Sequence, residues 1–557
     1  MSTPQTQRSG GRAAEIPGRR VAAPVMIMLP GGFSLGGMST WAIRLAGALS
    51  RGAGGVPRRR VVVVTHDADA SESPLGVAAE AAGIDVINLG GLPSLRAAAG
   101  DLRAFVPAYR DVVERLSRRA GMPCVVCPNS LGDAYGIAAA ISMTHPEILR
   151  VVGWQHSDIA YDTQVLAHYE PLLSAFVGVS THITERLRTR LARRAGDVYW
   201  VPYGVEVGEP RAVDAGASGL GSAGRPIRLV YTGRLEHEQK RIGALLRLPE
   251  ALAGLGVASE LTLVGDGPAG AEVAGAIART RRGLPGRLRL VDPASPDRVN
   301  EYLDSAEVFV LASRYEGLSV SMLEAMARGC VPVVTHVDSG AGDAIRHGES
   351  GLLARAPADA SDEEVARSIA REIAGMVRVP GSLRRMSIAA SRAVRERFNL
   401  ERHAALVSEV LDRVAASEPR AWPSDRACAF SASGATGSGS VPADAGARLR
   451  GVLAQIARES KESGPGERRV IVHGAGRHTI ELGSVLAEAA VPIVGIADDD
   501  PAKWGTRLLG WRVCSPAEAA QSGATDVIIS SWLHADAVYG RRAVYERCGV
   551  RVHHLYR

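Results

Sequence analysis

The stretch that most constrains this chain is VFVLASRYEGLSVSMLEAMARG, at residues 308–329. Its apolar start predicts a buried strand that ends at Ser313, and a Gly-Leu-Ser turn follows. The pattern from Val320 to Arg328 predicts a helix, which Gly329 ends. Ligands of parallel α/β sheets bind beyond the carboxyl ends of the strands, and a helix N-terminus favours an anion. The turn therefore predicts a phosphate-binding site.

Two carboxylates frame this turn. Glu316 precedes the predicted helix and Glu324 follows eight residues later, which is about 12 Å if the whole interval rises at helical pitch. Carboxylates that act together on one glycosidic bond lie only about 5–9.5 Å apart. We therefore expect the pair to hold opposite ends of a long ligand with a phosphate at its centre. A simpler interpretation stays open for each residue: Glu316 would complement the helix dipole, and Glu324 would pair with Arg328 on the helix surface.

Apolar strands alternate with helical stretches along most of the chain. This alternation predicts an α/β protein with doubly wound parallel sheets, and 557 residues are enough for three domains. The predicted strands lie at 25–29, 60–64, 124–127, 151–154, 175–179, 198–201, 228–231, 261–264, 308–313, 470–472 and 493–496.

The segments EGLSVSMLEAMARGCVPVV and SGAGDAIRHGESGLLA, which begin at Glu316 and at Ser339, resemble the donor-site signature of family 4 glycosyltransferases. Members of this family are retaining enzymes, and the resemblance covers about residues 24–415. It implies the GT-B architecture, in which two Rossmann-like doubly wound domains face each other across a cleft. It also implies that Glu316 contacts the donor sugar and that Glu324 holds the ribose hydroxyls of the nucleotide.

Two cations follow the strand at 228–231. Arg234 ends a Thr-Gly-Arg turn and Lys240 lies six residues further on. Fixed cations beside a departing diphosphate stabilise the transition state more than the ground state, and in the family an Arg and a Lys at this spacing hold the diphosphate. The alternative is a solvated basic loop.

A histidine follows the strand at 151–154. A neutral imidazole can hydrogen-bond a sugar hydroxyl, and the donor-sugar histidine of the family lies at this place, so the resemblance assigns that role to His156. A purely structural histidine is the alternative. With Glu316, Arg234 and Lys240, His156 completes the predicted catalytic set. The other predicted donor-binding residues lie in the glycine-rich loop after the first strand, in the loop after the strand at 261–264 and at the helix start: Gly31, Gly32, Gly36, Gly37, Gly265, Asp266, Gly317, Leu318, Ser319, Val320 and Glu324.

The last part of the chain is not covered by this resemblance. The strand at 470–472 leads to Gly474 and Gly476, and Asp498 lies 22 residues past the second glycine, as in half of a Rossmann fold. Thr479 occupies the place of the third glycine. The run GIADDDPAKWGTRLLGWRV resembles small nucleotide- or sugar-binding modules of polysaccharide biosynthesis proteins. We predict a Rossmann-like accessory module that binds a ligand or mediates homo-oligomerisation, and binding of NAD or another nucleotide stays open.

These observations together predict the domain organisation. We expect a disordered tail, an acceptor-side domain, a linker, a donor-side domain that closes with a crossover helix at about 390–415, a flexible linker and the accessory domain. Their predicted bounds are 1–23, 24–207, 208–226, 227–415, 416–446 and 447–557.

Composition argues against several other functions. The net charge is only +6 and aromatic residues make up 4% of the chain, which leaves few stacking platforms for nucleic acid. Six cysteines are too scattered for a disulfide framework. The pair Cys124 and Cys127 lies in a predicted strand without further ligands, so we predict no metal site.

The sequence also sets an expectation for location. No apolar run reaches 18 residues and the first twenty residues lack a signal-peptide core, so we expect a cytoplasmic protein. The arginine-rich segment 185–194 is interpreted as a solvated helix face, and weak peripheral contact with anionic lipid at the inner face of the membrane stays open.

The predicted function is that of a retaining, metal-independent glycosyltransferase of the hexosyltransferase type. It would move a sugar from a nucleotide-diphosphate sugar to an acceptor hydroxyl without a cofactor, in glycan, polysaccharide or glycolipid biosynthesis. Two alternatives stay open: a non-catalytic sugar-nucleotide sensor, and a sugar-nucleotide isomerase on the same fold. The donor base, the donor sugar and the acceptor have no transferable code in the sequence.

Overall fold

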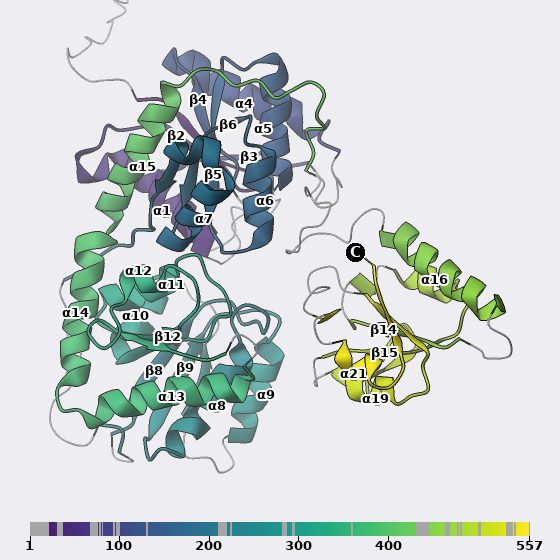
Figure 1. Cartoon of the computed structure of the whole chain (residues 1–557). Helices are drawn as coiled ribbons and strands as arrows, with labels where there is room; N and C mark the ends of the chain where they lie inside the picture. The colour runs from purple at the N-terminus through teal and green to yellow at the C-terminus, as the bar shows by residue number, and fades with distance from the viewer. Residues whose placement is uncertain are drawn as a thin grey trace, which may run out of the picture. The chain divides into compact units, whose positions relative to one another are not determined.

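In the computed structural model the chain forms two compact units (Figure 1). The first comprises the residues up to Phe430 except Ile159–Gln164, and the second comprises the residues after Phe430 together with Ile159–Gln164. The described residues are 22–30, 37–66, 76, 79–80, 82–92, 95, 101–129, 132–209, 220–222, 225–280, 287–291, 296–357, 360–430, 445–462, 468–475, 478–479, 482–499, 503–530, 538–539 and 542–555. Most of the predicted tail, most of the 208–226 linker and the segment 431–444 lie outside these ranges.

The first unit begins with a seven-stranded parallel sheet in the order β3-β2-β1-β4-β5-β6-β7. Every residue of β1, β2, β4 and β5 is buried, as expected for a parallel sheet covered on both faces. The strands are β1 (Val25–Met28), β2 (Val61–Thr65), β3 (Asp85–Asn88), β4 (Cys124–Cys127), β5 (Leu149–Gln155), β6 (Leu173–Gly178) and β7 (Val198–Trp200). The α-helices between them are α1 (Gly37–Arg51), α4 (Phe105–Ala120), α5 (Gly132–Thr144), α6 (Ala160–His168) and α7 (Thr181–Arg190).

A second parallel sheet of six strands follows in the order β10-β9-β8-β11-β12-β13. Its strands are β8 (Ile227–Thr232), β9 (Ser259–Val264), β10 (Arg287–Val291), β11 (Val308–Leu311), β12 (Val331–Thr335) and β13 (Leu352–Ala354). Its helices are α8 (Ile242–Ala253), α9 (Gly270–Thr280), α10 (Pro296–Ser305), α11 (Val320–Ala327), α12 (Ala341–Ala344) and α13 (Asp362–Arg378). Both sheets reverse their strand order once, as doubly wound folds do, so the predicted fold class is confirmed.

The predicted crossover helix is two helices, α14 (Ser382–Arg397) and α15 (Leu400–Ala415). The break occurs because Asn399 is extended and caps α15, where its side chain accepts a hydrogen bond from the Arg402 N–H at 2.8 Å. Helix α14 packs against α11, whereas α15 packs against α1 and the first sheet (Figure 1). The chain therefore returns from the second sheet to the first.

Residues 416–430 differ from the flexible linker that we expected from residue 416 onward. Trp422 is 2% exposed and its ring packs against Tyr169, and the Tyr169 hydroxyl donates a hydrogen bond to the Cys428 carbonyl at 2.6 Å. Burial of aromatic side chains outweighs the polar composition of this stretch. The Ser- and Gly-rich composition typical of a tether begins only after Phe430.

The second unit holds α16 (Ala445–Glu462) and a six-stranded sheet in the order β16-β17-β15-β14-β18-β19, parallel except for β16. Leu449, Leu453 and Ile456 of α16 form its core with Val470 and Ile528. The strands are β14 (Val470–His473), β15 (Ile493–Ala497), β16 (Arg507–Leu508), β17 (Trp511–Cys514), β18 (Asp526–Ile529) and β19 (Arg551–His554), and the short helices are α18 (Gly483–Ala487), α19 (Pro516–Ala520) and α21 (Ala543–Glu546). The predicted third α/β domain is therefore present.

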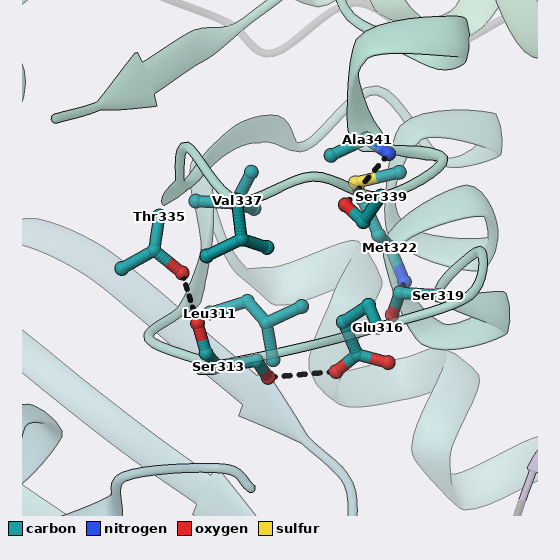
Figure 2. Close-up of a pocket in the computed structure, with 10 residues that line it drawn as sticks. Leu311, Ser313, Glu316, Ser319, Met322, Thr335, Val337, Ser339 and Ala341 are labelled. Carbon is teal, nitrogen blue, oxygen red and sulfur yellow. Dashed lines mark hydrogen bonds between the residues drawn. The ribbon is translucent and has the colours of Figure 1, made fainter. Parts of the chain in front are cut away.

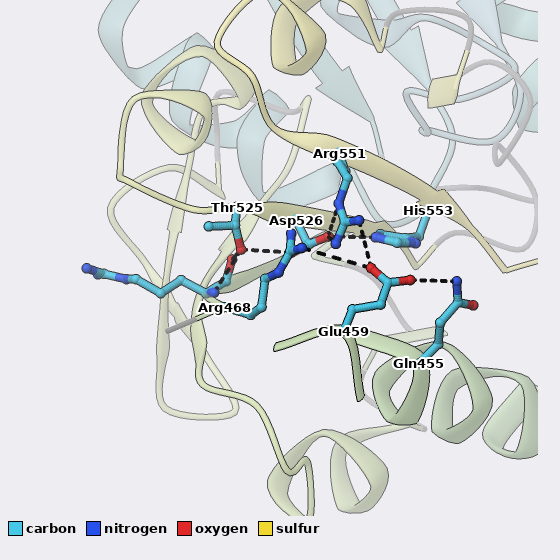
Figure 3. Close-up of polar contacts among 8 residues, drawn as sticks. Gln455, Glu459, Arg468, Thr525, Asp526, Arg551 and His553 are labelled. Carbon is cyan, nitrogen blue, oxygen red and sulfur yellow. Dashed lines mark hydrogen bonds and ion pairs between the residues drawn. The ribbon is translucent and has the colours of Figure 1, made fainter. Parts of the chain in front are cut away.

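A buried carboxylate links α16 to this sheet (Figure 3). Asp526 at the start of β18 is fully buried and bonds to His553 at 2.8 Å, to Arg551 at 3.1 Å and to Arg468 at 3.4 Å. Arg551 also pairs with Glu459 of α16 at 2.7 Å. This network lies at the amino end of the parallel strands, which is the end opposite the usual ligand site, so its role is structural.

Among the helices within the described ranges, none has the length and hydrophobicity needed to cross a bilayer. The arginine-rich segment forms α7 and the turn after it, and several of its charges are neutralised. Arg186 pairs with Asp158 at 2.6 Å, and Arg194 pairs with Asp197 at 2.5 Å. These pairs leave less positive charge for an anionic membrane than the sequence suggests.

Candidate active site

The site is centred on Glu316, which lies just past the carboxyl end of β11. Its Oε1 accepts hydrogen bonds from the Ser313 hydroxyl at 2.7 Å and from the Lys240 ammonium at 2.5 Å. The Glu316 and Lys240 side chains are only 12% and 17% exposed. A small pocket opens beside them, and Figure 2 shows Glu316 and Ser319 along its wall. Its lining residues are Leu311, Ser313, Glu316, Ser319, Met322, Val334, Thr335, Val337, Ser339 and Ala341.

Helix α11 begins at this pocket. Ser319 is its N-cap, and the Ser319 side chain accepts a hydrogen bond from the Met322 N–H at 3.2 Å. The first N–H groups of a helix have no intrahelical partner, and the helix dipole adds partial positive charge at the same end. The turn before α11 is held from the β12 side, because the Gly340 N–H donates to the Gly317 carbonyl at 2.5 Å. The pocket therefore has one wall that favours an anion.

The two predicted cations lie in one loop at the same edge. The Gln239 side chain donates to the Tyr315 carbonyl at 3.1 Å, and the Arg314 N–H donates to the Gln239 carbonyl at 2.8 Å. These bonds hold the loop against the segment that carries Glu316. Arg234 is more open: its side chain is 56% exposed and pairs with Glu236 at 3.0 Å. Arg234, Lys240 and Glu316 thus share one edge of the second sheet, as the sequence predicts.

The loop after β9 packs against the Arg234 loop. Gly265 has a φ of 153°, and a Cβ there would lie 1.9 Å from the Gly233 carbonyl oxygen, so no side chain fits. The Leu235 N–H donates to the Asp266 carbonyl at 2.8 Å. The Asp266 carboxylate accepts from the Gly267 N–H at 2.7 Å, and this bond stabilises its own turn.

His156 follows β5 in the first sheet. Its Nδ1 bonds to the Tyr203 hydroxyl at 2.6 Å, and its Nε2 lies 3.3 Å from the Asn129 side-chain oxygen. Burial, with a smaller contribution from His403, lowers the pKa of His156 to about 3. The imidazole is therefore neutral at physiological pH and acts by hydrogen bonding. The Nε2 bond to Asn129 is the longer, and therefore the weaker, of the two.

The edges of the two sheets touch next to His156. A Cβ on Gly317 would lie 2.0 Å from the His156 carbonyl oxygen, so glycine is required for this approach. The Thr181 N–H also donates to the Asp343 carboxylate of the second sheet at 2.8 Å. The predicted residue His156 of the acceptor-side domain is thereby brought next to the segment that carries Glu316.

Glu324 has a partner that the sequence analysis missed. Its Oε1 pairs with Nη2 of Arg44 in α1 at 2.6 Å. The pair with Arg328 considered from the sequence is not formed, because Arg328 bonds to Asn300 and Asp304 instead. A signal for Arg44 was present in the sequence: it is a lone charge within the apolar segment WAIRLAGAL of α1.

The start of α1 lies beside the start of α11. A Cβ on Gly37 would lie 3.7 Å from a methyl group of Val320, which is ordinary van der Waals contact. Gly31, Gly32 and Gly36, which were predicted to bind the donor phosphates with Gly37, lie outside the described residues. The described part of the glycine-rich loop therefore reaches the anion-favouring end of α11.

The accessory domain has its own glycine turn after β14. Gly474 has a φ of 126°, and the Asp498 carboxylate accepts from the Ala475 N–H at 2.5 Å and pairs with Lys503 at 3.2 Å. Thr479, in the place of the third glycine, donates to the Gly474 carbonyl. Gly476 lies outside the described residues. The Asp498 carboxylate, which the sequence pattern suggests as part of a nucleotide site, is thus already bonded to the turn.

A reactive cysteine pair and a metal site were the other candidates from the sequence, and the described parts of the chain contain neither. Burial raises the pKa of the Cys127 thiol to about 12, and it raises the pKa of Cys124 further, so neither thiol forms a reactive thiolate. Within the same ranges, no group of three or more His, Cys, Asp or Glu side chains could hold a metal ion.

Comparison with known proteins agrees with this geometry. Residues 226–374 match the family Glycosyl transferases group 1. The Bacillus subtilis protein EpsF is 31% identical over 154 residues, which are 26% of this chain and 39% of EpsF. A D-inositol 3-phosphate glycosyltransferase of Rhodococcus opacus is 27% identical over 242 residues, which are 42% of this chain and 51% of that protein. The chain thus spans about half, or less, of these curated relatives.

The solved structure of Anabaena HepE in complex with UDP-glucose is similar to the chain, with a TM-score of 0.52 and 17% sequence identity. The similarity covers 70% of this chain and 99% of HepE. At this identity the likeness shows the fold alone, which is that of the GT-B glycosyltransferases. The family match and the relatives support a group 1 glycosyltransferase.

Proposed function

We propose that this protein is a retaining glycosyltransferase that moves a sugar from a nucleotide-diphosphate sugar to an acceptor hydroxyl. The observation that carries the proposal is the Glu316–Lys240 pair at the start of α11, with Arg234 in the same loop as Lys240. A carboxylate suited to a sugar hydroxyl, two cations and a helix N-terminus meet there. This set matches a sugar diphosphate in charge.

In this proposal the diphosphate of the donor binds between the start of α11 and the two cations. Negative charge grows on the outer phosphate as the sugar departs, and the fixed positive charges are already in place to stabilise it. Lys240 would exchange its bond to Glu316 for one to a phosphate oxygen, which would release the carboxylate for the sugar. We propose that these groups supply the charge that a metal ion supplies in other transferases.

The retaining outcome is proposed from the same geometry. His156 and Glu316 would fix the sugar between the two sheet edges, and the departing phosphate would help to deprotonate the acceptor on the face that it leaves. Because His156 is neutral, its contribution is a hydrogen bond. Positioning and charge stabilisation would then account for most of the rate enhancement.

The experiment screens UDP-, GDP- and ADP-sugars for thermal stabilisation of the whole chain and then for release of nucleoside diphosphate with cell-extract acceptors. Stabilisation followed by acceptor-dependent release that persists in EDTA is expected. Binding without release would favour a sugar-nucleotide sensor, and interconversion of the free donor without an acceptor would favour an isomerase. Retention is tested separately, by the anomeric configuration of the product.

Other parts of the proposal depend on the second unit. We propose that it is an accessory module and that glycan, polysaccharide or glycolipid synthesis is the setting. The ligand of this module, its part in homo-oligomers and contact with a membrane stay predictions. Size-exclusion measurements on the whole chain and on a chain that ends at Phe430 would test the oligomeric role.

A further inference from the structure

The contact between Arg44 and Glu324 joins the two sheets of the first unit. Arg44 lies in α1, which belongs to the first sheet, and Glu324 lies in α11 of the second sheet. Nη2 of Arg44 is 2.6 Å from Oε1 of Glu324, and the two side chains are 20% and 19% exposed. The carboxylate that the family resemblance assigns to the ribose is thus held by a residue from the opposite domain.

This pair differs from an ordinary surface ion pair in one respect. Nη1 of Arg44 is shielded from solvent and has no hydrogen-bond partner within the described ranges. Exposed ion pairs contribute little to stability, and a buried donor without a partner is costly. The unpaired Nη1 of Arg44 is explained if this nitrogen donates a hydrogen bond to an oxygen of a bound ligand.

The surroundings indicate which ligand would meet it. Glu324 lies four residues after Val320, so it is about one helical turn, or 6 Å, from the start of α11 and on the same side of the helix. Val320 also lies near Gly37 at the start of α1, where a Cβ on the glycine would be 3.7 Å from a Val320 methyl group. A nucleotide whose phosphates lie at the start of α11 would place its ribose near Glu324 and Arg44.

We propose that Arg44 is a positioning residue for the ribose of the donor. Nη2 would hold Oε1 of Glu324 so that Oε2 and the second lone pair of Oε1 face the vicinal diol, and Nη1 would donate to an oxygen of the nucleotide. Since Arg44 comes from the acceptor-side domain, the ribose site is complete only when the edges of the two sheets are together. This inference rests on the proposed function.

The test measures dissociation constants of UDP, GDP and ADP and of their 2′-deoxy counterparts for the whole chain. Loss of a bond to a charged carboxylate predicts that the best ribonucleotide binds roughly tenfold or more tighter than its 2′-deoxy form. In Arg44→Ala the ratio of the dissociation constant of the 2′-deoxy form to that of the ribonucleotide should fall to about two or three. Arg44→Lys should restore part of it, and Glu324→Gln should abolish it alone and in combination with Arg44→Ala.

Two control variants distinguish a positioning role of Arg44 from a general weakening of the contact between the two sheets. Thr181→Val removes the hydroxyl that donates to Asp343 at another contact between the sheets, and Arg51→Ala removes an exposed arginine from the last turn of the same helix. Both should leave the ratio at the wild-type value, even if Thr181→Val weakens all six ligands equally.

Three results would overturn the inference. An unchanged ratio in Arg44→Ala would show that Arg44 does not act on the ribose, although the proposed function would stand. If the wild-type chain bound the ribonucleotides and their 2′-deoxy forms equally tightly, Glu324 would not act on the ribose, and neither would Arg44. A wild-type chain that binds none of the nucleotides would refute the proposed function itself.

Discussion

Two sheets of this chain end in a carboxylate beside a lysine, and the two pairs are built differently. Glu316 after β11 pairs with Lys240, 76 residues earlier in the chain, and accepts a further bond only from the side chain of Ser313 among the described residues. Asp498 after β15 pairs with Lys503, only five residues away, and also accepts from the Ala475 backbone. The exposed fractions of the two carboxylates are 12% and 11%, so burial does not distinguish them.

The difference lies in what each carboxylate does to its neighbouring turn. Among the described residues, Glu316 accepts no hydrogen bond from the amide groups at the start of α11, and its own partner is a lysine that could bind a phosphate instead. Asp498 occupies an N–H group of the glycine turn where a Rossmann-type phosphate would bind. A charged pair at the carboxyl end of a sheet therefore indicates a ligand site only when the turn beside it stays available.

The largest expected effect is on catalysis at the first pair. Glu316→Gln or Arg234→Ala should lower turnover on the order of a hundredfold or more, because in the proposed function each removes a group that binds the reacting part of the donor. The measurement is the rate of nucleoside diphosphate release with the best donor and acceptor, alongside circular dichroism to show intact folding. Asp498→Asn serves as the matched control and should turn over at the wild-type rate. Wild-type activity in either first-unit variant would contradict the proposed site.

The second effect concerns the stability of the accessory domain. Asp526→Asn should destabilise that domain by about 2–3 kcal/mol, since it leaves the charges of Arg468 and Arg551 without their buried partner. Hydrogen exchange of β14 and β18 in the whole chain would report the loss, whereas Glu316→Gln should leave these strands unchanged. Unaltered exchange in Asp526→Asn would mean that the network in Figure 3 contributes little.

A related pH effect is expected at the same carboxylate. Burial alone would raise the pKa of Asp526, but hydrogen bonds from His553 and Thr525 and the charge of Arg551 lower it to about 2. The unfolded chain binds this proton at a higher pH than the folded chain does. Its stabilising contribution is therefore present above about pH 4 and is lost as the pH falls toward 2. Acid unfolding followed in wild type and in Asp526→Asn should differ in slope only in that window.

A smaller effect should appear when Asp498 is changed to Asn. The variant keeps the shape of the side chain but weakens the bonds to Ala475 and Lys503, so we expect about 1–2 kcal/mol of lost stability around β15. Thermal unfolding followed through Trp504, whose indole donates to the Asp498 carbonyl at 2.7 Å, gives the readout. If Asp498→Asn instead abolished binding of NAD or another nucleotide by the whole chain, the glycine turn of the accessory domain would be a ligand site. The inferred difference between Glu316 and Asp498 would then be wrong.

A further expected effect is the pH dependence of the first unit. Burial lowers the pKa of His156 to about 3 and that of His403 to about 4. Below the ordinary histidine pKa the unfolded chain binds these protons and the folded chain does not, so stability falls as the pH drops from about 6.5 toward 4. Each histidine contributes a slope of up to about 1.4 kcal/mol per pH unit. His156→Gln should remove the contribution of one histidine to the slope of stability against pH. An unchanged slope would argue against a neutral, buried His156.

Much of this architecture could be predicted from the sequence. Buried parallel strands are continuous apolar runs, so segments such as Val308–Leu311 and Cys124–Cys127 can be predicted from the sequence alone. Not every strand was predicted: β3 at Asp85–Asn88 and β19 at Arg551–His554 have exposed or half-buried residues throughout, and their place in the sheet depends on a neighbour to pair with. The buried strands β12 and β18 were missed as well. The break at Asn399 was also missed, because capping depends on local geometry that composition does not express.

The sequence alone determined where we expect the site, because a strand end, a glycine turn and a helix start must lie next to one another along the chain. Only the tertiary structure decided the partners: Lys240 beside Glu316, Arg44 beside Glu324, and the His156 carbonyl against Gly317. These contacts join residues that are between 76 and 280 positions apart. Such pairs are set by how the sheets close on each other, and no periodicity within one segment records that arrangement.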